Sequence, residues 1–382
     1  MTDRYLADWC EAHRAEQLAL LKELAAIPAP SHQEERRVVF IRDWLTQAGA
    51  KDVQVDAAQN VLLPFGCEGW DGITVYMAHT DVVFPDTTPL PVREENGRLC
   101  APGVGDDTAN VVALLLCAKF LLTRQAVPKE PILLVFNSCE EGLGNLKGIR
   151  RLMEDYAGRI REVVSFDGER DTLVDRAVGS ERWQVRVRTC GGHSYSAFGR
   201  PNAIAHLAGL IDRLYHQPLP AVPDSKTTYN VGVIQGGTSV NTIAQDAEML
   251  YEYRSDDKTC LSQMRAQFQD LVAAANGPKA QFETVLLGER PCGGDVPQEA
   301  EERLLARCAQ AITAVIGQTP RRRSASTDAN IPFSLGIPAT AFSLYQGAGA
   351  HTREEYVEID TLCPGLQTAL TLLAPSFAFP EH

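Results

Sequence analysis

Apolar runs of strand length alternate with helix-length segments between residues 73 and 168, and this alternation constrains the fold more than any other feature. Strands that are separated by helices usually pair in parallel, because each helix returns the chain to the same end of the sheet. The sequence therefore predicts an α/β fold with a mixed, mostly parallel sheet that is sandwiched by helices. The expected elements include, in chain order, helix 11–26, strand 73–78, helix 108–122, strand 132–136, helix 144–156 and strand 163–166.

The pattern changes after Gly179, where polar and apolar residues begin to alternate along the strand candidates. The order strand, helix, strand, strand, helix, strand is typical of the split motif of ferredoxin-like domains. Helix and strand signals of the first kind resume near residue 291. We therefore expect a catalytic domain of residues 1–180 and 291–382, interrupted by an inserted ferredoxin-like α+β domain of residues 181–290. The elements expected in the insertion are strand 183–189, helix 202–215, strands 228–234 and 248–253, helix 261–276 and strand 281–287.

Charge and composition exclude several classes of partner. The formal net charge of -13 argues against binding to nucleic acid or to an anionic membrane surface. The run from Val111 to Leu122 is too short to span a bilayer and contains Lys119, and the first ten residues lack the apolar core of an export signal. The ten cysteines form no Cys-x-x-Cys pair, which favours reduced thiols. We expect a cytoplasmic protein with no nucleic-acid or membrane partner.

Side chains that can bind metal follow the predicted strands. In an open parallel sheet the carboxyl ends of the strands line the ligand crevice, so these side chains should converge there. A set of histidines and carboxylates suits a divalent metal such as zinc. The candidates are, in chain order, His79, Asp81, Asp106, Asp107, Glu140, Glu141, Asp167 and His351.

Glu140 and Glu141 are adjacent acids directly after the apolar run that ends at Phe136. Two neighbouring anions are costly to bury unless cations compensate them. A solvated surface pair is the alternative for such acids when they stand alone. If metal compensates them here, one carboxylate can bind the metal while its neighbour transfers protons.

Five motifs in order resemble the dinuclear zinc hydrolases of peptidase family M20. The family includes tripeptide aminopeptidase (peptidase T), carnosinase-type dipeptidases, carboxypeptidase G, acetylornithine deacetylase and succinyl-diaminopimelate desuccinylase. The resemblance spans residues 77–351, and the inserted domain lies where the family has its lid or dimerisation domain. The motifs are Met77-Ala-His-Thr-Asp81, Gly105-Asp-Asp107, Cys139-Glu-Glu-Gly142, Phe166-Asp-Gly168 and Gly349-Ala-His351.

The resemblance implies a zinc exopeptidase type of fold and two divalent metal ions. Zinc is the expected metal, and cobalt and manganese are the alternatives. A cis peptide bond between Asp106 and Asp107 is also implied. The implied ligands are Asp106 as the bridge, His79 and Asp167 on one metal, and Glu141 and His351 on the other.

The resemblance also implies catalytic and substrate-binding roles. Glu140 would be the general base and then the general acid, and Asp81 would hydrogen-bond the free ring nitrogen of His79. His193, in Gly191-Gly-His193-Ser194, would reach the partner subunit's site in a homodimer formed through the inserted domain and stabilise the oxyanion. Asn241 and Arg254 would bind the substrate carboxylate. For His193 a polar turn residue, and for Arg254 an exposed strand-end charge, are the alternatives.

Two positions depart from the common pattern or refine it. Many family members have lysine where this chain has Thr108, so we expect different loop packing but unchanged metal binding. Asp167 is typical of aminopeptidase and dipeptidase members, whereas many carboxypeptidases and deacylases have glutamate there. Arg321-Arg-Arg323 is either an anion site or a solvated loop, and the loop is the expectation. The segment of residues 324–330 that follows resembles a family loop near the substrate.

The function expected from the sequence is dizinc-dependent hydrolysis of the amide bond in short peptides, by a peptidase T-like aminopeptidase. The first alternative is an N-acyl-amino-acid deacylase that uses the same scaffold and the same metals. The second is a metal-dependent binding protein without catalysis, which the presence of Glu140 and all five expected ligands disfavours.

Overall fold

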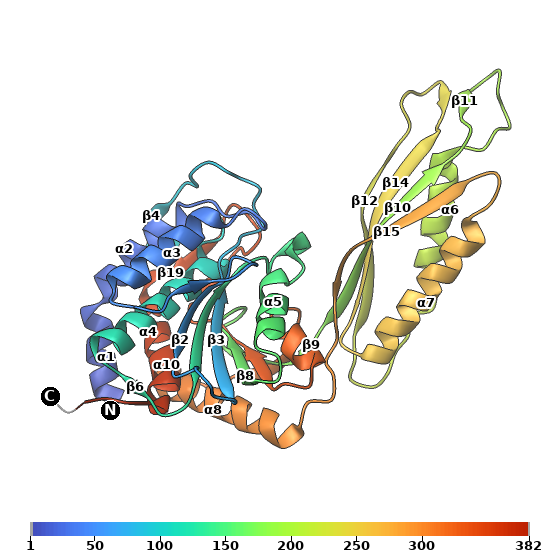
Figure 1. Ribbon diagram of the computed structural model, residues 1–382. Helices are drawn as coiled ribbons and strands as arrows, with labels where there is room; N and C mark the ends of the chain where they lie inside the picture. Colours follow the sequence, from blue (N-terminus) through green and yellow to red (C-terminus); the bar gives the residue numbers. More distant parts are fainter. Residues whose placement is uncertain (1–2, 381–382) are drawn as a thin grey trace. The chain divides into compact units, whose positions relative to one another are not determined.

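The computed structural model describes residues 3–380 and divides into two compact units. One unit consists of the chain up to Arg176 and from Gly294 onwards, and the other is Ala177–Gly293 (Figure 1). The limits of the insertion expected from the sequence are 181 and 290. The strands β10 (Gly179–Arg188) and β15 (Gln281–Arg290), which begin and end the second unit, are each longer than the alternating patterns alone indicate.

The larger unit is built on a six-stranded sheet with the order β1-β2-β7-β3-β8-β17. Neighbours among β7, β3, β8 and β17 pair in parallel, whereas β2 is antiparallel to β7 and β1 is antiparallel to β2. The mixed, mostly parallel sheet expected from the sequence is therefore present. The strands are β1 (Gln54–Val55), β2 (Val61–Phe65), β3 (Ile73–His79), β7 (Ile132–Asn137), β8 (Ile160–Ser165) and β17 (Ala339–Ala341).

The register of the parallel strands brings their carboxyl ends to one edge of the sheet. His79 at the end of β3 is opposite Asn137 at the end of β7, and Met77 is opposite Ser165 at the end of β8. Ser165 is in turn opposite Ala341 of β17. The residues that follow these strands therefore all lie near the carboxyl edge of the sheet.

Helices cover both faces of this sheet. The connection β3–α4–β7 crosses the sheet in one direction and β7–α5–β8 crosses back, so right-handed crossovers put α4 and α5 on opposite faces (Figure 1). The helix α4 is apolar around its whole circumference because it packs between the sheet and the outer helices. The helices of the unit are α1 (Asp3–Ala12), α2 (Arg14–Ala25), α3 (Glu35–Gln47), α4 (Asn110–Thr123), α5 (Lys147–Asp155), α8 (Gln298–Ile316), α9 (Asn330–Ser334) and α10 (Leu362–Leu373).

Several short elements were not predicted. A four-stranded antiparallel sheet of order β18-β19-β5-β4 carries the loop of His351, and its strands have only two or three residues each. Segments this short contain no readable periodicity. Single 3₁₀ turns occur at Gly142–Gly144, Ile359–Thr361 and Ala374–Ser376. The short strands are β4 (Arg93–Glu95), β5 (Arg98–Cys100), β6 (Val127–Pro128), β9 (Thr172–Ala177), β16 (Arg321–Ala325), β18 (Gly347–Ala348), β19 (Tyr356–Glu358) and β20 (Phe377–Ala378).

Two sequence-based expectations were wrong in detail. The single helix expected at 11–26 is α2, and α1 precedes it with a break at His13. Arg321–Arg323 were expected in a solvated loop but lie in β16, which pairs with β9. All three arginines form ion pairs, with Asp171, Glu302 and Glu169 respectively.

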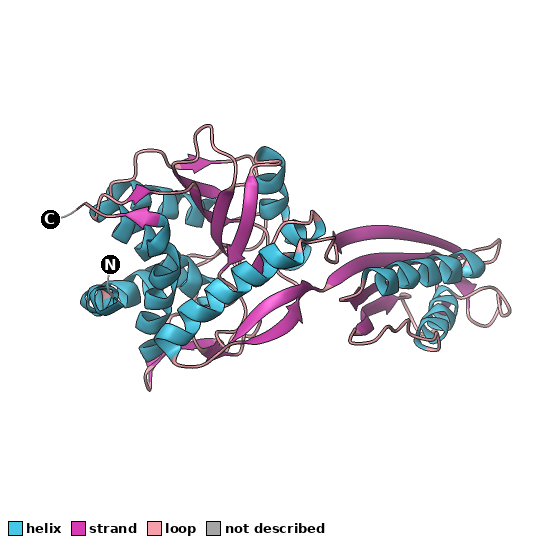
Figure 2. Ribbon diagram, turned by 90° about the horizontal axis from the view of Figure 1, so that it is seen from below, coloured by secondary structure: helices cyan, strands magenta, loops and turns pink. Residues whose placement is uncertain are grey.

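The second unit has a four-stranded antiparallel sheet of order β12-β14-β10-β15, which is the order of the split βαββαβ motif. Both helices of the motif lie along the same face of this sheet (Figures 1 and 2). The core between them includes Val185, Leu207, Met249 and Phe268. The elements are β10 (Gly179–Arg188), β11 (Gly192–His193), α6 (Ala203–Tyr215), β12 (Thr227–Gly236), β13 (Thr242–Ile243), β14 (Asp246–Ser255), α7 (Lys258–Ala275) and β15 (Gln281–Arg290).

Two further features bear on the sequence-based expectations. Within residues 3–380 no helix has both the length and the apolar character that a bilayer crossing requires. All ten cysteines are free thiols, and most of them are buried in the cores rather than paired.

Candidate metal centre

Potential metal ligands converge at the carboxyl edge of the six-stranded sheet. They form three overlapping groups, and within each group the donor atoms lie within 4.8 Å of one another. All five ligands expected from the sequence are included, together with Glu140 and Asp107. The groups are His79 with Asp106, Asp107 and Asp167; His79 with Glu140 and Glu141; and Asp106 with Glu141 and His351.

The carboxylate of Asp106 lies between the two histidines. Its Oδ1 is 3.1 Å from His79 Nε2, and its Oδ2 is 3.1 Å from His351 Nε2. His351 Nε2 is also 3.1 Å from Glu141 Oε1. Two ligands on one tetrahedral zinc, each bound at about 2 Å, are about 3.3 Å apart. The two oxygens of Asp106 therefore face two separate donor sets with spacings that fit metal coordination.

The loop that presents Asp106 is fixed by a buried acid, Glu355. The carboxylate of Glu355 accepts hydrogen bonds from the backbone N–H groups of Gly103 (2.8 Å), Gly105 (2.9 Å) and Asp106 (2.8 Å). The peptide bond between Asp106 and Asp107 is cis, as the resemblance implied. A Cβ atom at Gly105 would come within 2.6 Å of the hydroxyl of Tyr345, so only glycine fits there.

Both carboxylate oxygens of Asp107 accept hydrogen bonds from neighbouring elements of the fold. Its Oδ2 accepts from the backbone N–H of His79 at 2.8 Å, and its Oδ1 accepts from Asn110 Nδ2 at 2.6 Å. Asp107 thus ties the end of β3 to the start of α4. Asp107 therefore stabilises the loop that presents Asp106.

Thr108 stands where many family members have lysine, and it is part of a buried contact. Arg37 Nη1 donates to Thr108 Oγ1 at 3.0 Å, and Thr108 Oγ1 donates to the carbonyl oxygen of Gly103 at 2.5 Å. Arg37, which is fully buried, also donates to the carbonyl oxygens of Ile27 and Thr80. A threonine therefore closes the ligand loop here through contacts to the loop itself.

Asp81 holds the strand end that carries the two glutamates. Its carboxylate accepts from the backbone N–H groups of Glu140 (3.0 Å) and Glu141 (2.9 Å) and from Ser31 Oγ (2.6 Å). His79 Nδ1 lies 3.1 Å from the backbone oxygen of Asp81 and 3.5 Å from its Oδ1. The nearest acceptor for the free ring nitrogen is therefore the backbone oxygen, with the carboxylate slightly farther away.

The buried acids outnumber the cations around them. Burial, together with the charge of Asp106, raises the pKa of both Glu141 and Asp167 to about 7. Burial also disfavours the charge of Asp106, but hydrogen bonds from His351 and His79 hold its pKa below the usual value. Hydrogen bonds to Asp106 and Glu141 raise the pKa of His351 to about 10. The two histidines compensate only part of this negative charge, and divalent cations fit both the remaining charge and the nitrogen and oxygen donors.

Two of the three residues expected to act from the second unit lie together. His193 in β11 is paired with Thr242 of β13, and the backbone N–H of Ser194 donates to the backbone oxygen of Asn241 at 2.9 Å. His193 Nδ1 accepts from the backbone N–H of Tyr195 at 3.2 Å. With Nδ1 as acceptor, the neutral ring carries its proton on Nε2, which is then an exposed donor.

Arg254 does not lie with His193 and Asn241. It is at the far end of β14, opposite Ser180 and Thr228 in the neighbouring strands. Its guanidinium already binds Glu252 through Nε at 3.0 Å and Nη2 at 3.1 Å. The sequence placed both residues in one substrate contact, whereas the strand separates them.

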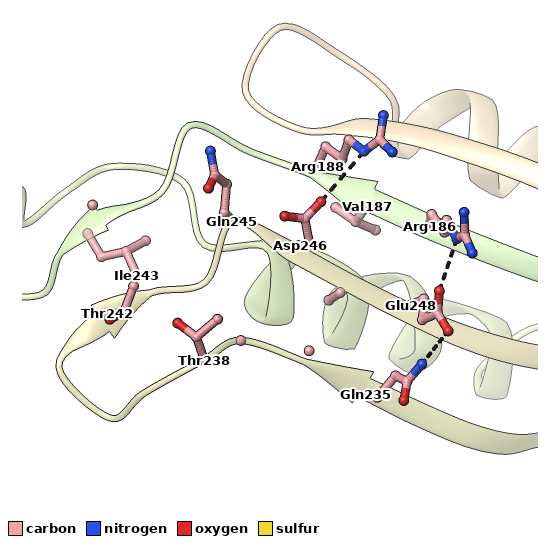
Figure 3. A pocket seen from close by; sticks show the side chains of 14 residues that line it. Arg186, Val187, Arg188, Gln235, Thr238, Thr242, Ile243, Gln245, Asp246 and Glu248 are labelled. Atoms are coloured by element: carbon pink, nitrogen blue, oxygen red, sulfur yellow. Dashed lines mark hydrogen bonds and ion pairs between the residues drawn. The ribbon is translucent and has the colours of Figure 1, made fainter.

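A cavity of about 540 Å³ in the second unit contributes no residue to the three groups of potential metal ligands found among the described residues (Figure 3). Its charged side chains are paired with one another. Arg186 binds Glu248 at 3.0 Å, and Arg188 lies 3.5 Å from Asp246. Gln235 donates to Glu248 as well (Figure 3).

Sequence reasoning missed the residues that support the ligands. Nothing in the sequence marked Glu355 as a supporting residue, except that it lies four residues after His351. Asp328 is fully buried, accepts from Asn137 Nδ2 at 2.7 Å, and has its pKa raised well above the usual value by burial and by the charge of Glu140. Only the loop of residues 324–330, which resembles a family segment, pointed towards it.

Comparison with known proteins agrees with this geometry. The model of peptidase family M20/M25/M40 matches residues 75–374. The acetylornithine deacetylase of Myxococcus xanthus is 28% identical over 335 residues, which cover 84% of this chain and 83% of that protein.

Solved structures share the fold. A tripeptidase from Staphylococcus aureus superposes with a TM-score of 0.75 at 20% identity, covering 95% of this chain and 98% of that one. A dinuclear metal-binding peptidase of family M20 from Bacillus subtilis superposes with a TM-score of 0.65 at 17% identity, covering 95% and 98%. The family match extends over most of the chain and includes every ligand motif. The chain is therefore a metallo-hydrolase that belongs to peptidase family M20/M25/M40.

Proposed function

We propose that this metallo-hydrolase uses two zinc ions to hydrolyse the amide bond of short peptides. The observation that carries the proposal is the carboxylate of Asp106, whose two oxygens each lie 3.1 Å from a different histidine. Asp106 would bridge the two ions, with His79 and Asp167 on one and Glu141 and His351 on the other. Cobalt and manganese suit the same nitrogen and oxygen donors. When bound, the two ions would polarise the scissile carbonyl and lower the pKa of the attacking water.

Glu140 is the residue proposed to transfer the proton. It is 5% exposed, and its donor atom lies in the same group as those of His79 and Glu141. Asp81 fixes its backbone, so the side chain starts from a rigid strand end. Glu140 would take the proton of the attacking water and then deliver it to the nitrogen of the leaving amine. Glu141 is engaged with His351 and is thereby assigned to a metal instead.

The second candidate function is N-acyl-amino-acid deacylation on the same scaffold. It is favoured by the sequence relative at 28% identity, which is an acetylornithine deacetylase. Asp167 favours the peptidase, because this position resembles that of aminopeptidase and dipeptidase members. Both reactions hydrolyse an amide and would use Glu140 in the same way.

We propose further that the chain acts as a homodimer through the second unit. Three large apolar side chains next to His193 and Asn241 are almost fully exposed: Tyr195 (89%), Phe198 (90%) and Val240 (101%). Such a cluster typically marks an interaction surface. The strand β12 is also a sheet edge, with Ile234 54% exposed, and could pair with a second copy.

In this dimer His193 would act on the partner subunit's site. Its Nε2–H donor would stabilise the oxyanion that forms when the carbonyl is attacked. Asn241, which is adjacent to His193, is proposed to contact the substrate carboxylate. Arg254 is proposed for the same role, for which it would have to exchange Glu252 for the substrate.

A substrate panel distinguishes the two candidate functions. We expect the zinc-loaded chain to hydrolyse di- and tripeptides with a higher kcat/KM than N-acetyl amino acids. The amine released from each compound would be measured under identical conditions. Turnover of the acyl compounds alone would replace the peptidase with the deacylase.

Metal binding should depend on pH, because protons compete with metal for the ligands. In the metal-free chain the pKa values of Glu141 and Asp167 are about 7 and that of His351 is about 10. The affinity for zinc should therefore rise steeply with pH up to about 7, and more gradually above it, where only the histidines still release protons. Competition with a chelator between pH 5.5 and 8.5 measures the slope. A constant affinity over this range would contradict the ligand assignment.

Replacing the proposed base should separate catalysis from metal binding. We expect Glu140→Gln to lower kcat by about 10²–10⁴-fold, because the amide cannot accept the proton. Metal content should stay near two ions per chain, measured by atomic emission on the purified protein. The matched variant Glu141→Gln should instead lose metal. Retained turnover in Glu140→Gln would place the base elsewhere.

Mixed dimers test the proposed action of His193 across subunits. His193→Ala should lower kcat by about 10²-fold, the typical effect of losing one oxyanion donor, with unchanged metal content. Random mixing of inactive Glu140→Gln and His193→Ala chains should restore about a quarter of wild-type activity, since half of the dimers would contain one complete site. An active monomer by light scattering, or no recovery on mixing, would rule out this role.

A further inference from the structure

A second cavity, of about 430 Å³, lies in the larger unit, and its lining includes the sequence neighbours of two proposed metal ligands. Its wall is formed by Gly168–Asp171, which follow Asp167, and by Tyr345–Ala350, which precede His351. Both loops therefore continue from proposed metal ligands. A substrate whose scissile bond lies at the metals would extend into this space, which is large enough for an acyl group or a side chain.

Arg170 is the positively charged group of this wall. Among the described residues its guanidinium makes one hydrogen bond, from Nη2 to Gln346 Oε1 at 3.1 Å. Gln346 is neutral, so the charge of Arg170 is not neutralised by that contact. The pKa of Arg170 is lowered by burial, which the more distant Asp360 and Asp171 only partly offset. A half-buried guanidinium with unused N–H donors is a binding group for an anion.

The carboxylates beside Arg170 are already engaged by other groups. Glu169 is ion-paired with Arg323, and Asp171 is bound by Arg321 at 3.0 Å. Pairing of β9 with β16 brings both arginines to this loop. The third carboxylate of the wall, Glu355, accepts the three backbone N–H groups described above. Arg321 and Arg323 thus bind the two acids next to Arg170 in sequence, and Asp171 and Asp360 act on the charge of Arg170 only from a distance.

The cavity of the second unit provides the contrast. There Arg186 and Arg188 are matched by Glu248 and Asp246 within the same wall (Figure 3). A guanidinium that is already paired with a carboxylate of the protein gains little binding energy from a substrate carboxylate. Arg170 has no carboxylate within ion-pair distance among the described residues.

We infer that Arg170 and Gln346 form a carboxylate subsite, so that the preferred amide substrates carry an acidic group near the scissile bond in addition to the main-chain carboxylate of a dipeptide or N-acyl amino acid. The acidic group belongs either to the acyl portion or to the amine portion of the substrate. The guanidinium would bind it through two parallel N–H···O hydrogen bonds. This inference rests on the proposed hydrolysis of amides and specifies the class of substrate for the same site.

Matched substrate pairs test the subsite in the zinc-loaded full-length chain. The pairs are Glu-Ala with Gln-Ala, Ala-Glu with Ala-Gln, and N-succinyl-alanine with its succinamide. In at least one pair we expect the wild-type kcat/KM to favour the acidic member by about 10- to 100-fold, the effect of one charge-assisted contact. The pair that shows the preference identifies the portion of the substrate that carries the acid.

Arg170→Gln should abolish this preference. We expect it to reduce kcat/KM for the acidic member to that of the neutral one, and to change the neutral one by less than about threefold. Arg170→Lys should recover part of the preference, because it retains the charge without the planar fork. The control is Arg322→Gln, which removes the same charge from β16, where Arg322 binds Glu302 at 2.8 Å and does not line the cavity.

The outcomes separate this inference from the proposed function. If the wild-type chain hydrolyses none of the amides with zinc bound, the proposed function is wrong. If it hydrolyses them without an acidic preference, or if Arg170→Gln keeps that preference, the subsite alone is wrong. If Arg322→Gln loses the preference equally, the effect comes from the overall charge and the subsite is again wrong.

Discussion

The rest of the larger unit depends on keeping the carboxylate of Asp106 between two imidazoles. Its two oxygens lie 3.1 Å from His79 and from His351, which come from opposite ends of the family match. To bridge two metal ions as proposed, this carboxylate must keep both oxygens open to ligands, so its own backbone has to be fixed by other groups. Glu355 provides this support by accepting the backbone N–H groups of Gly105 and Asp106, and the next residue, Asp107, accepts the backbone N–H of His79. Two further acids are therefore buried to position one, and cations are needed to compensate them.

Much of this arrangement could be predicted from the sequence because strand ends are recognisable. Continuous apolar runs indicate buried parallel strands, and the residue after each run must lie at the carboxyl edge. This rule brings His79, the pair Glu140–Glu141 and Asp167 to the same edge, and the family resemblance then assigns Glu141 rather than Glu140 to a metal. The strands next to His351 are too short to recognise in the sequence. The order of the five family motifs then assigns His351 to the same site.

The supporting residues could not be predicted, because their role depends on contacts that sequence spacing does not encode. Glu355 reaches back about 250 positions to Gly105, and Asp328 reaches Asn137 across 191 positions. An isolated acid in a polar segment is usually a surface residue, so neither is distinguishable from one. The distance of Arg254 from Asn241 could not be predicted for the same reason. The motifs indicated one shared carboxylate contact, whereas the strand register places Arg254 at the other end of β14.

The separation between catalytic parts and substrate-binding parts explains how one scaffold can serve both peptidases and deacylases. Three of the five proposed ligands and Glu140 lie at or after strand ends of the six-stranded sheet, whereas Asp106 and His351 lie on loops. Arg170 lies in the loop between β8 and β9, which can change without disturbing the sheet. The chain as a whole carries a formal charge of -13 and repels acidic compounds at long range. Because salt screens that repulsion beyond about 8 Å, the proposed subsite at Arg170 would still favour acidic amides inside the cavity.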